Sequence, residues 1–551
     1  FMILLVVITL AACKTTVKPV PQSSTSSTSP DFRAPAYPLI TIDPYTSAWS
    51  MGDNLYDSPV RHWTGKTHSL IGAIRVDGKV YRFMGKEERP LQPVIPMAKE
   101  EHWQGKYTFK RPPSGWEKHN FNDKTWKTGT AAFGSQGMDD AETVWKTDEI
   151  WVRREFTFPE KNSKDELFLV YSHDDDFELY LNGKELVNTG RQAKSNVVLK
   201  IDNSLLNIEG KNVIAAHCLD RGGLAYVDFG IYTENEIKDV FADAAIQDSV
   251  TLSATQTYYY FTCGPINLKI QFTSPLLPDN LDLLSRPVNY ITYNAVSTDG
   301  NEHDVQIYFD ATPQWAVNDI SQEVEVTTGS FEDVYYAKTG TTEQPVLQKK
   351  GDNVRIDWGY FYLAASGSEE NSIGIGDFTG LKENFTSNGN ISSTETSITN
   401  VMTDNMQALA YVDNLGGVTS RPKENYLMVA YDDVESIQYF QDNLKAWWTQ
   451  NGEITIADAL QSASDEYNQV MESCNNFDEK LWNETLNAGG ENYADLCVLA
   501  YRQSVAAHKL VKDTQGNILF LSKENFSNGS IGTVDVTYPS APLFLKYNVS
   551  L

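Results

Sequence analysis

The sequence has few cysteines and lacks the short motifs that bind zinc or nucleotides. Only five of its 551 residues are cysteine, and no two of them form a CxxC pair. Neither a zinc site nor a thioredoxin-type centre is therefore indicated, and a buried free thiol is expected at Cys218, Cys263, Cys474 and Cys497. No GxGxxG or Walker-type loop is present, so no nucleotide site is expected. We accordingly predict no metal and no cofactor.

Basic residues are scarce relative to acidic ones. Lys and Arg number 45 against 73 Asp and Glu, which gives a formal charge of −28 at pH 7. Nucleic acids and anionic membrane surfaces carry negative charge and bind proteins through basic patches. Both are therefore excluded as expected partners.

The N-terminal apolar run, from Met2 to Cys13, is too short to span a bilayer but has the length of a signal-peptide core. Leu10-Ala11-Ala12-Cys13 is similar to a bacterial lipobox, which implies cleavage before Cys13 and acylation of its sulfur. A tether rich in Ser, Thr and Pro follows over residues 14–30. We therefore predict an exported protein with lipidation at Cys13, anchored to a bacterial envelope membrane and either periplasmic or surface-exposed. Because neither an initiator Met nor a basic segment precedes the run, truncation is expected at this end.

Much of the chain is predicted to be β-structure. Residues 70–76 and 79–83 alternate in polarity on either side of Asp77-Gly78, which predicts a hairpin. Between residues 251 and 421, runs separated by Pro, Asn and Gly favour a large sandwich with little helix. Its strands are expected at residues 255–261, 266–272, 288–295, 303–311, 324–328, 354–364 and 407–413.

Residues 88–236 have a different character. Phe177, Leu179 and Leu181 alternate with polar residues before an Asn182-Gly183 turn, as in an antiparallel strand and its hairpin. An antiparallel sandwich with close termini is easily inserted into a loop of a host domain, so we predict an insertion. The stretch resembles the galactose-binding-like jelly-roll sandwich of many glycosidases at residues 116, 121–126, 133–134, 143–145, 150–156 and 173–183.

After Ala430 the apolar period changes from two to 3.6. Helices are predicted over residues 434–447, 456–486 and 493–508, and a fourth is predicted to start at Ser540. Asp432 and Asp433 are expected to cap the first of them. Sequential helices after a β domain are typical of the beginning of an α/α toroid. Because such a toroid needs about a dozen helices, truncation is expected at the C-terminus too.

One polar stretch, residues 519–545, has the composition of a loop that lines a cavity. An apolar run enters it and a helix is expected to leave it. Several ionisable and amide side chains lie between, namely Lys523, Glu524, Asn525, Asn528 and Asp535.

Several stretches share the motifs of one enzyme family. Residues 502–509, 521–529 and 533–545 resemble the central six-hairpin domain of the glutaminase A family. Residues 35–85, with Asp43-Pro-Tyr, Ser47-Ala-Trp-Ser and His62-Trp-Thr-Gly, resemble its N-terminal segment. Phe272-Thr-Ser-Pro-Leu and Ser285-Arg-Pro-Val-Asn-Tyr resemble its β domain. The resemblance implies a secreted amidohydrolase on a glycosidase-like scaffold, releasing ammonia from L-glutamine or a related amide.

The predicted fold class is a multidomain β plus α protein. It comprises a large β-sandwich, an inserted galactose-binding-like jelly-roll sandwich and the first part of an (α/α) six-hairpin toroid. The predicted divisions are a signal peptide at 1–13, a tether at 14–30, a glutaminase A-like N-terminal sandwich at 31–87 and 237–429, the insertion at 88–236 and the partial toroid at 430–551.

Amide hydrolysis requires a group that activates water, donors for the oxyanion and an acid for the leaving ammonia. Glu524 and Asp535 are the predicted catalytic carboxylates. The predicted substrate-binding residues are Lys523, Asn525, Asn528, Arg502, His62 and Trp63, with His508, Asp432 and Asp433 as lesser candidates.

Alternatives remain open. Ser522 or Ser530 would be a nucleophile with Lys523 as its base. A glycoside hydrolase would place two carboxylates about 5 Å apart for retention, or roughly 6.5 to 9.5 Å apart for inversion. A non-catalytic glycan binder would act through the insertion. In each case the expected partner is a small-molecule amide or a glycan substrate. Contact with the membrane is expected only through the N-terminal lipid anchor.

Overall fold

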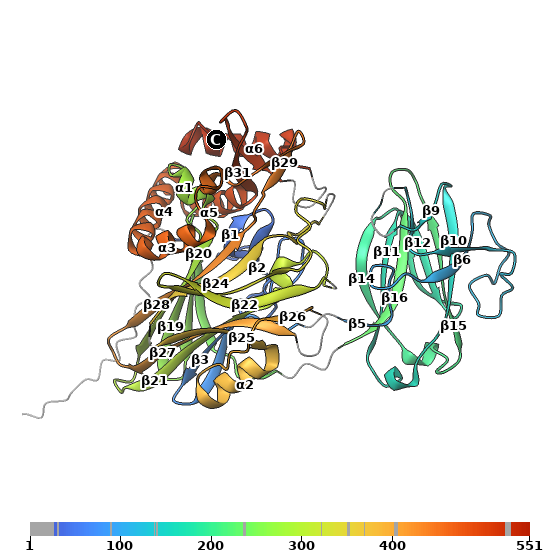
Figure 1. The fold of residues 1–551 in the computed structure, drawn as a ribbon, viewed down its shortest axis with the longest axis horizontal. Helices are drawn as coiled ribbons and strands as arrows, with labels where there is room; N and C mark the ends of the chain where they lie inside the picture. Colours follow the sequence, from blue (N-terminus) through green and yellow to red (C-terminus); the bar gives the residue numbers. More distant parts are fainter. Residues whose placement is uncertain are drawn as a thin grey trace, which may run out of the picture.

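The computed structural model describes residues 27–29, 32–88, 91–136, 138, 141–234, 239–320, 322–349, 353–368, 370–401, 406–523 and 530–551. The predicted leader with Cys13 lies outside these residues, as do Glu524, Asn525 and Asn528. Figure 1 shows a large β-sandwich with helices at one end and a second β-body beside it. None of the helices in the described ranges has both the length and the apolarity needed to cross a bilayer.

Two antiparallel sheets form the large sandwich, with nine strands in one and five in the other. Their facing side chains share a core, to which Ile270 and Ile291 contribute from the larger sheet and Ile74 and Ile307 from the smaller. The larger sheet runs in the order β17 (Ile246–Leu252), β18 (Gln256–Cys263), β19 (Ile266–Thr273), β20 (Val288–Ser297), β28 (Lys423–Asp432), β24 (Tyr360–Ser366), β23 (Val334–Thr341), β22 (Val324–Phe331) and β26 (Ser397–Thr399). The smaller runs β25 (Asn371–Asp377), β27 (Gln407–Val418), β21 (His303–Ala311), β3 (Leu70–Val76) and β4 (Lys79–Met84).

The predicted hairpin is present as β3 and β4. Asp77 and Gly78 have φ of 48° and 88°, the left-handed pair that a two-residue hairpin turn requires. One strand prediction is wrong in its start, because residues 354–359 precede β24 rather than belong to it. Two short helices, α1 (Leu281–Ser285) and α2 (Phe378–Asn388), interrupt the β-structure.

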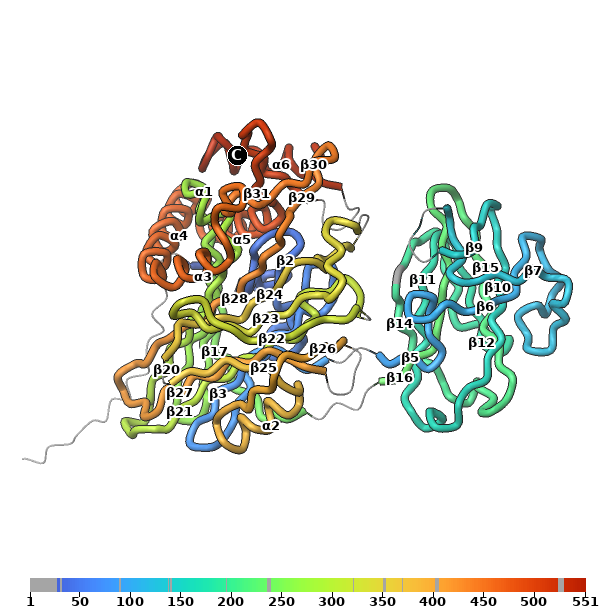
Figure 2. The backbone as a smooth tube through the Cα atoms, viewed as in Figure 1, coloured from blue at the N-terminus to red at the C-terminus, as the bar shows by residue number. Residues whose placement is uncertain are grey.

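The second β-body comprises residues within the predicted insertion, and the described strands in it pair only with one another. Leu179 and Ile214 from one of its sheets and Leu169 and Phe229 from the other share a core of their own, which makes it a sandwich (Figure 2). Its strands are β5 (Gln92–Ile95), β6 (Gln104–Thr108), β7 (Lys127–Thr130), β8 (Phe133–Gly134), β9 (Thr143–Val144), β10 (Glu149–Thr157), β11 (Leu167–Asp174), β12 (Asp176–Leu181), β13 (Lys184–Thr189), β14 (Lys194–Ile201), β15 (Lys211–Leu219) and β16 (Tyr226–Thr233).

The helical part packs on the larger sheet. Tyr290 of β20 donates to the carbonyl of Ala463, and Tyr501 donates to the carbonyl of Leu276, so helices and sheet share buried hydrogen bonds. The elements are α3 (Ile456–Asp465), α4 (Tyr467–Gly489), α5 (Glu491–Ala506), the hairpin β31 (His508–Lys512) and β32 (Ile518–Ser522), and α6 (Val534–Tyr547). The prediction of a multidomain β plus α protein is confirmed.

The predicted helix over 434–447 is wrong. Its apolar spacing comes from a hairpin, β29 (Ile437–Tyr439) and β30 (Asp442–Leu444), in which Ile437 and Leu444 are cross-strand partners. Both pack on Val511, so residues seven apart share a face without a helix. Phe440 occupies the turn and is 85% exposed.

Two helix boundaries also differ from prediction. The last helix begins at Val534, so Ser540 is not its N-cap; instead its hydroxyl donates to the carbonyl of Val536 inside the helix. The third predicted helix ends at Ala506, because His508 already pairs with Ser522 in the β31–β32 hairpin.

Candidate functional site

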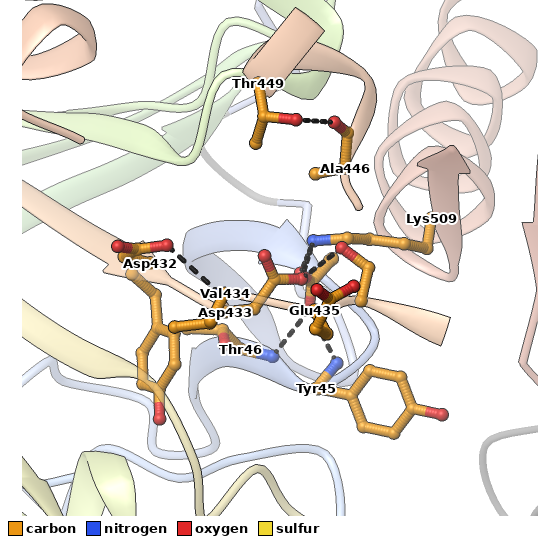
Figure 3. A network of polar contacts seen from close by, with 12 residues as sticks. Tyr45, Thr46, Asp432, Asp433, Val434, Glu435, Ala446, Thr449 and Lys509 are labelled. Atoms are coloured by element: carbon orange, nitrogen blue, oxygen red, sulfur yellow. Dashed lines mark hydrogen bonds and ion pairs between the residues drawn. The ribbon is translucent and has the colours of Figure 1, made fainter. Parts of the chain in front are cut away.

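Three distant segments converge on the ammonium of Lys509. Its Nζ lies 2.7 Å from Asp433 Oδ2 (Figure 3) and 2.6 Å from Asp43 Oδ2. None of the three side chains is more than 8% exposed. Asp43 ends β1 (Tyr37–Asp43), Asp433 follows β28, and Lys509 belongs to β31. We call these three residues the ion triad.

The backbone and a hydroxyl hold the two carboxylates in place. Asp43 Oδ1 accepts hydrogen bonds from the amides of Tyr45 and Thr46, and Ser436 donates to Asp433 Oδ2 at 2.6 Å. Burial by itself would lower the pKa of Lys509, but the two carboxylates raise it above its ordinary value. The ammonium therefore stays charged at neutral pH, as a buried pair of carboxylates requires.

Asp432 and Asp433 were predicted to cap a helix, and this prediction is wrong because no helix follows them. Asp432 Oδ1 instead accepts from the amide of Val434 in a turn. The chain passes close to Gly359 here, whose φ of +74° and lack of a side chain leave room for the Asp432 carbonyl.

A hollow of about 360 Å³ lies beside the hairpin that β1 forms with the next strand and beside the C-terminal end of α5. Ser47 and Trp49 line it from β2 (Thr46–Ser50), and Gln503 lines it from α5. Its lining residues are Ala36, Ser47, Trp49, Met51, Trp63, Gln503, Ala506 and Ala507.

Two of the predicted substrate-binding residues belong to this region. Trp63 lines the hollow, and its indole donates to the carbonyl of Pro44 at 2.6 Å. The Nζ of Lys523 lies 5.3 Å from the centroid of the Trp63 ring and 5.8 Å from that of Tyr45. The amide of Lys523 donates to Ala507, so the polar segment is attached to the wall of the hollow.

His62 and Arg502 lie behind the surface. His62 is fully buried, its ring centroid lies 5.1 Å from that of Trp63 at a tilt of 47°, and its Nδ1 is hydrogen-bonded to the Thr64 hydroxyl. Burial lowers its pKa well below the usual range. Arg502 is 1% exposed and donates to the hydroxyls of Thr41 and Ser274, and burial lowers its pKa to about 10. Both residues therefore support the wall and do not line the hollow.

The remaining predictions fall elsewhere. Asp535 is exposed in the first turn of α6, where a carboxylate favours the helix dipole. Ser522 is 1% exposed and its hydroxyl faces Thr537 at 3.1 Å, whereas Ser530 is exposed. Glu524, Asn525 and Asn528 lie outside the described residues. Among the residues that the structure covers, no three His, Cys, Asp or Glu side chains are grouped to hold a metal ion.

Sequence reasoning did not select Asp43, Lys509, Trp49 or Gln503. Asp43 and Lys509 are 466 residues apart, so no local spacing links them. The one available signal was the Asp43-Pro-Tyr motif, because a charged residue that ends an apolar strand requires a partner.

His508 gives a testable dependence of stability on pH. It is buried between Phe520 and Phe544, and burial lowers its pKa to about 4. Below about pH 6.5 the unfolded state takes up a proton that the folded state refuses, so stability falls as the pH falls from about 6.5 towards 4. We expect His508→Gln to reduce this slope in melting temperatures measured by circular dichroism between pH 7.5 and pH 5.

His303 provides the contrast to His508. Its imidazole donates hydrogen bonds to the carboxylates of Asp77 and Asp299, and these bonds raise its pKa. Its contribution is therefore present below about pH 6.5 and is lost as the pH rises. His303→Gln should make the acid-side slope steeper, and a flatter slope in that variant would contradict the interpretation.

The fold and the site define a class, namely a β-sandwich protein with a helical part, in which a buried ion triad links the β31 strand between α5 and α6 to Asp43 and Asp433. Comparison with known families gives three matches. The Glutaminase A six helical-hairpin domain matches residues 490–551, and two domains of unknown function, DUF4964 and DUF5127, match residues 7–96 and 255–484. These matches support the assignment to the glutaminase A family that the resemblance predicted.

Two relatives carry related names. The chain is 25% identical over 312 residues to Glutaminase A of Aspergillus oryzae, covering 55% of this chain and 44% of that protein. It is 24% identical over 304 residues to a probable glutaminase of Arthroderma benhamiae, covering 51% and 34%. The chain thus spans less than half the length of either relative.

Solved structures are only distantly similar. A glycosyl hydrolase family 2 member from Bacteroides cellulosilyticus aligns with 60% of this chain and 31% of its own, at 9% identity and a TM-score of 0.20. A beta-glycosidase from Bacteroides vulgatus aligns with 39% and 32%, at 16% identity and a TM-score of 0.21. These TM-scores are too low to carry an argument about function.

Proposed function

We propose that the protein is a hydrolase of the glutaminase A type that releases ammonia from L-glutamine or a related amide. The names of the two relatives support this activity. The structural observation that carries the proposal is the convergence of the three matched regions. Asp43, Asp433 and Lys509 come one from each of them, so the family's segments meet at one place.

The proposed roles follow from the chemistry of the side chains. Glu524 and Asp535 are the carboxylates that activate water and protonate the leaving ammonia, and Asn525, Asn528 and Lys523 donate hydrogen bonds to the substrate. Of these three donors the structure describes Lys523, whose Nζ lies 5.3 Å from the centroid of the Trp63 ring. The ion triad keeps that wall in place and takes no part in the chemistry.

The test is ammonia release from L-glutamine by the complete gene product, followed in a coupled glutamate dehydrogenase assay. L-Asparagine and a γ-glutamyl amide serve as neighbouring substrates, and heat-denatured protein serves as the blank. Saturable release above the blank supports the proposal. If all three amides are untouched by folded protein, the proposed activity is refuted.

We further propose that the protein is exported and anchored to a bacterial envelope membrane through a lipid on Cys13. The apolar run that ends at Cys13 and the polar tether after it support this. In cells fed radiolabelled palmitate, wild-type protein should carry the label and fractionate with membranes. Cys13→Ser should abolish both, and a labelled Cys13→Ser protein would contradict the proposal.

A further inference from the structure

The hollow is lined by uncharged side chains in the part of the chain that the structure describes. Charged residues make up 21% of the chain, yet none of the described residues that line the hollow is Asp, Glu, Lys, Arg or His. Two indoles, a thioether and three alanine methyl groups form most of its wall. Lys523, whose ammonium lies 5.3 Å from the centroid of the Trp63 ring, is 2% exposed and is not among the lining residues.

The two tryptophans offer ring surface more than hydrogen bonds. The Nε1 of Trp49 donates to the hydroxyl of Ser47 at 3.1 Å, and the Nε1 of Trp63 donates to the carbonyl of Pro44. With both N–H groups engaged inside the protein, the indoles present apolar area to a ligand. Gln503 adds an exposed amide that can both donate and accept a hydrogen bond.

This combination does not suit a free amino acid. L-Glutamine carries a carboxylate and an ammonium, and bringing either against an apolar wall without a partner of opposite charge is costly. A sugar ring is the opposite case, because it is neutral, has a C–H face that packs on indoles and has hydroxyl groups that exchange hydrogen bonds with an amide. A volume of about 360 Å³ falls in the range of small-molecule sites, roughly 300 to 1,000 Å³.

We propose that the hollow is a binding subsite for a neutral sugar residue, held on Trp49 and Trp63 and hydrogen-bonded by Gln503. This subsite goes beyond the proposed amide hydrolysis, because it binds a ligand of another chemical class. It would direct the protein to glycans or to glycan-linked amides.

The test uses the complete gene product and neutral probes, namely glucose, galactose, N-acetylglucosamine and their disaccharides. L-Glutamine and glucuronic acid are the charged comparisons. Binding is followed by tryptophan fluorescence and by isothermal titration calorimetry. We expect at least one neutral sugar to saturate and to change the indole emission, whereas glucuronic acid should bind at least tenfold more weakly than its neutral counterpart.

Two variants probe the wall directly. Ala507→Met places a longer side chain in the hollow and should abolish sugar binding. Gln503→Ala removes an exposed amide from a helix and should weaken binding about fivefold, the effect of losing one hydrogen bond. Gln515→Ala, in the exposed turn between β31 and β32, is the matched control and should bind as wild type does.

Clear outcomes would overturn the subsite. One is that no neutral sugar saturates, and another is that Ala507→Met and Gln503→Ala bind as wild type does. A third is that these variants raise the KM for L-glutamine and no sugar binds, which would make the hollow the amide pocket. Sugar binding that depends on the hollow, with no ammonia release from any amide, would refute the proposed activity and leave the subsite intact.

Discussion

Replacing Glu524 with Gln should lower the kcat for ammonia release by about 10² to 10⁴, the usual contribution of a general acid or base. The amide cannot take a proton from water, yet it keeps the size and the hydrogen-bonding capacity of the carboxylate. The KM should therefore change little, because substrate binding is largely preserved. Steady-state kinetics with L-glutamine on the complete gene product gives both quantities.

Glu479→Gln is the matched control for that experiment. Glu479 is an exposed residue of α4, so the same chemical change there should leave kcat unaltered. Asp535→Asn tests the second proposed carboxylate in the same assay. A kcat within twofold of wild type in Glu524→Gln would remove Glu524 from the mechanism, and the same result in Asp535→Asn would remove Asp535.

Replacing Lys509 with Met should destabilise the fold by about 3 to 5 kcal/mol, as expected when a buried ion pair loses one partner. Asp43 and Asp433 would then face each other, buried, without a cation between them. Urea denaturation of wild type and variant at pH 7.5 measures the loss.

Lys512→Met is the control for this prediction, because Lys512 lies on the same strand but is half-buried, and its ammonium is 5.4 Å from the centroid of the half-buried Trp447 ring. Its loss should cost less than about 1 kcal/mol, as for other partly exposed charges. The triple variant Asp43→Asn, Asp433→Asn, Lys509→Met should recover part of the stability. Equal effects of Lys509→Met and Lys512→Met would show that the triad does not hold the segments together.

Local sequence patterns predicted secondary structure well, except where one spacing of apolar residues fits both a helix and a hairpin. The β3–β4 hairpin was predictable because Asp77-Gly78 and the alternation beside it act within fourteen residues or so. The hairpin around Phe440 was mistaken for a helix. Ile437 and Leu444 lie seven residues apart, which fits two helical turns and equally fits a cross-strand pair.

The candidate site was predictable only in part, because only some of its residues lie in contiguous motifs. Trp63 and Lys523 lie in short motifs that the family resemblance marked, and the structure places their side chains 5.3 Å apart, from Nζ to ring centroid. The triad was not predictable, since its aspartates and lysine occupy three separate segments of the chain. The hollow was not predictable either, because its lining includes small residues such as Ala506 and Ala507 that carry no signal by themselves.

The sequence by itself indicated the family resemblance, the β plus α class and the positions of many strands. These depend on composition, on periodicity and on motifs that are contiguous in the chain. Only the tertiary structure decided that Asp43 and Asp433 share one ammonium and that the described residues lining the hollow are uncharged. A buried charge costs desolvation free energy, which an opposite charge within about 3 Å offsets. Which opposite charge comes that close depends on the tertiary packing and not on the local sequence.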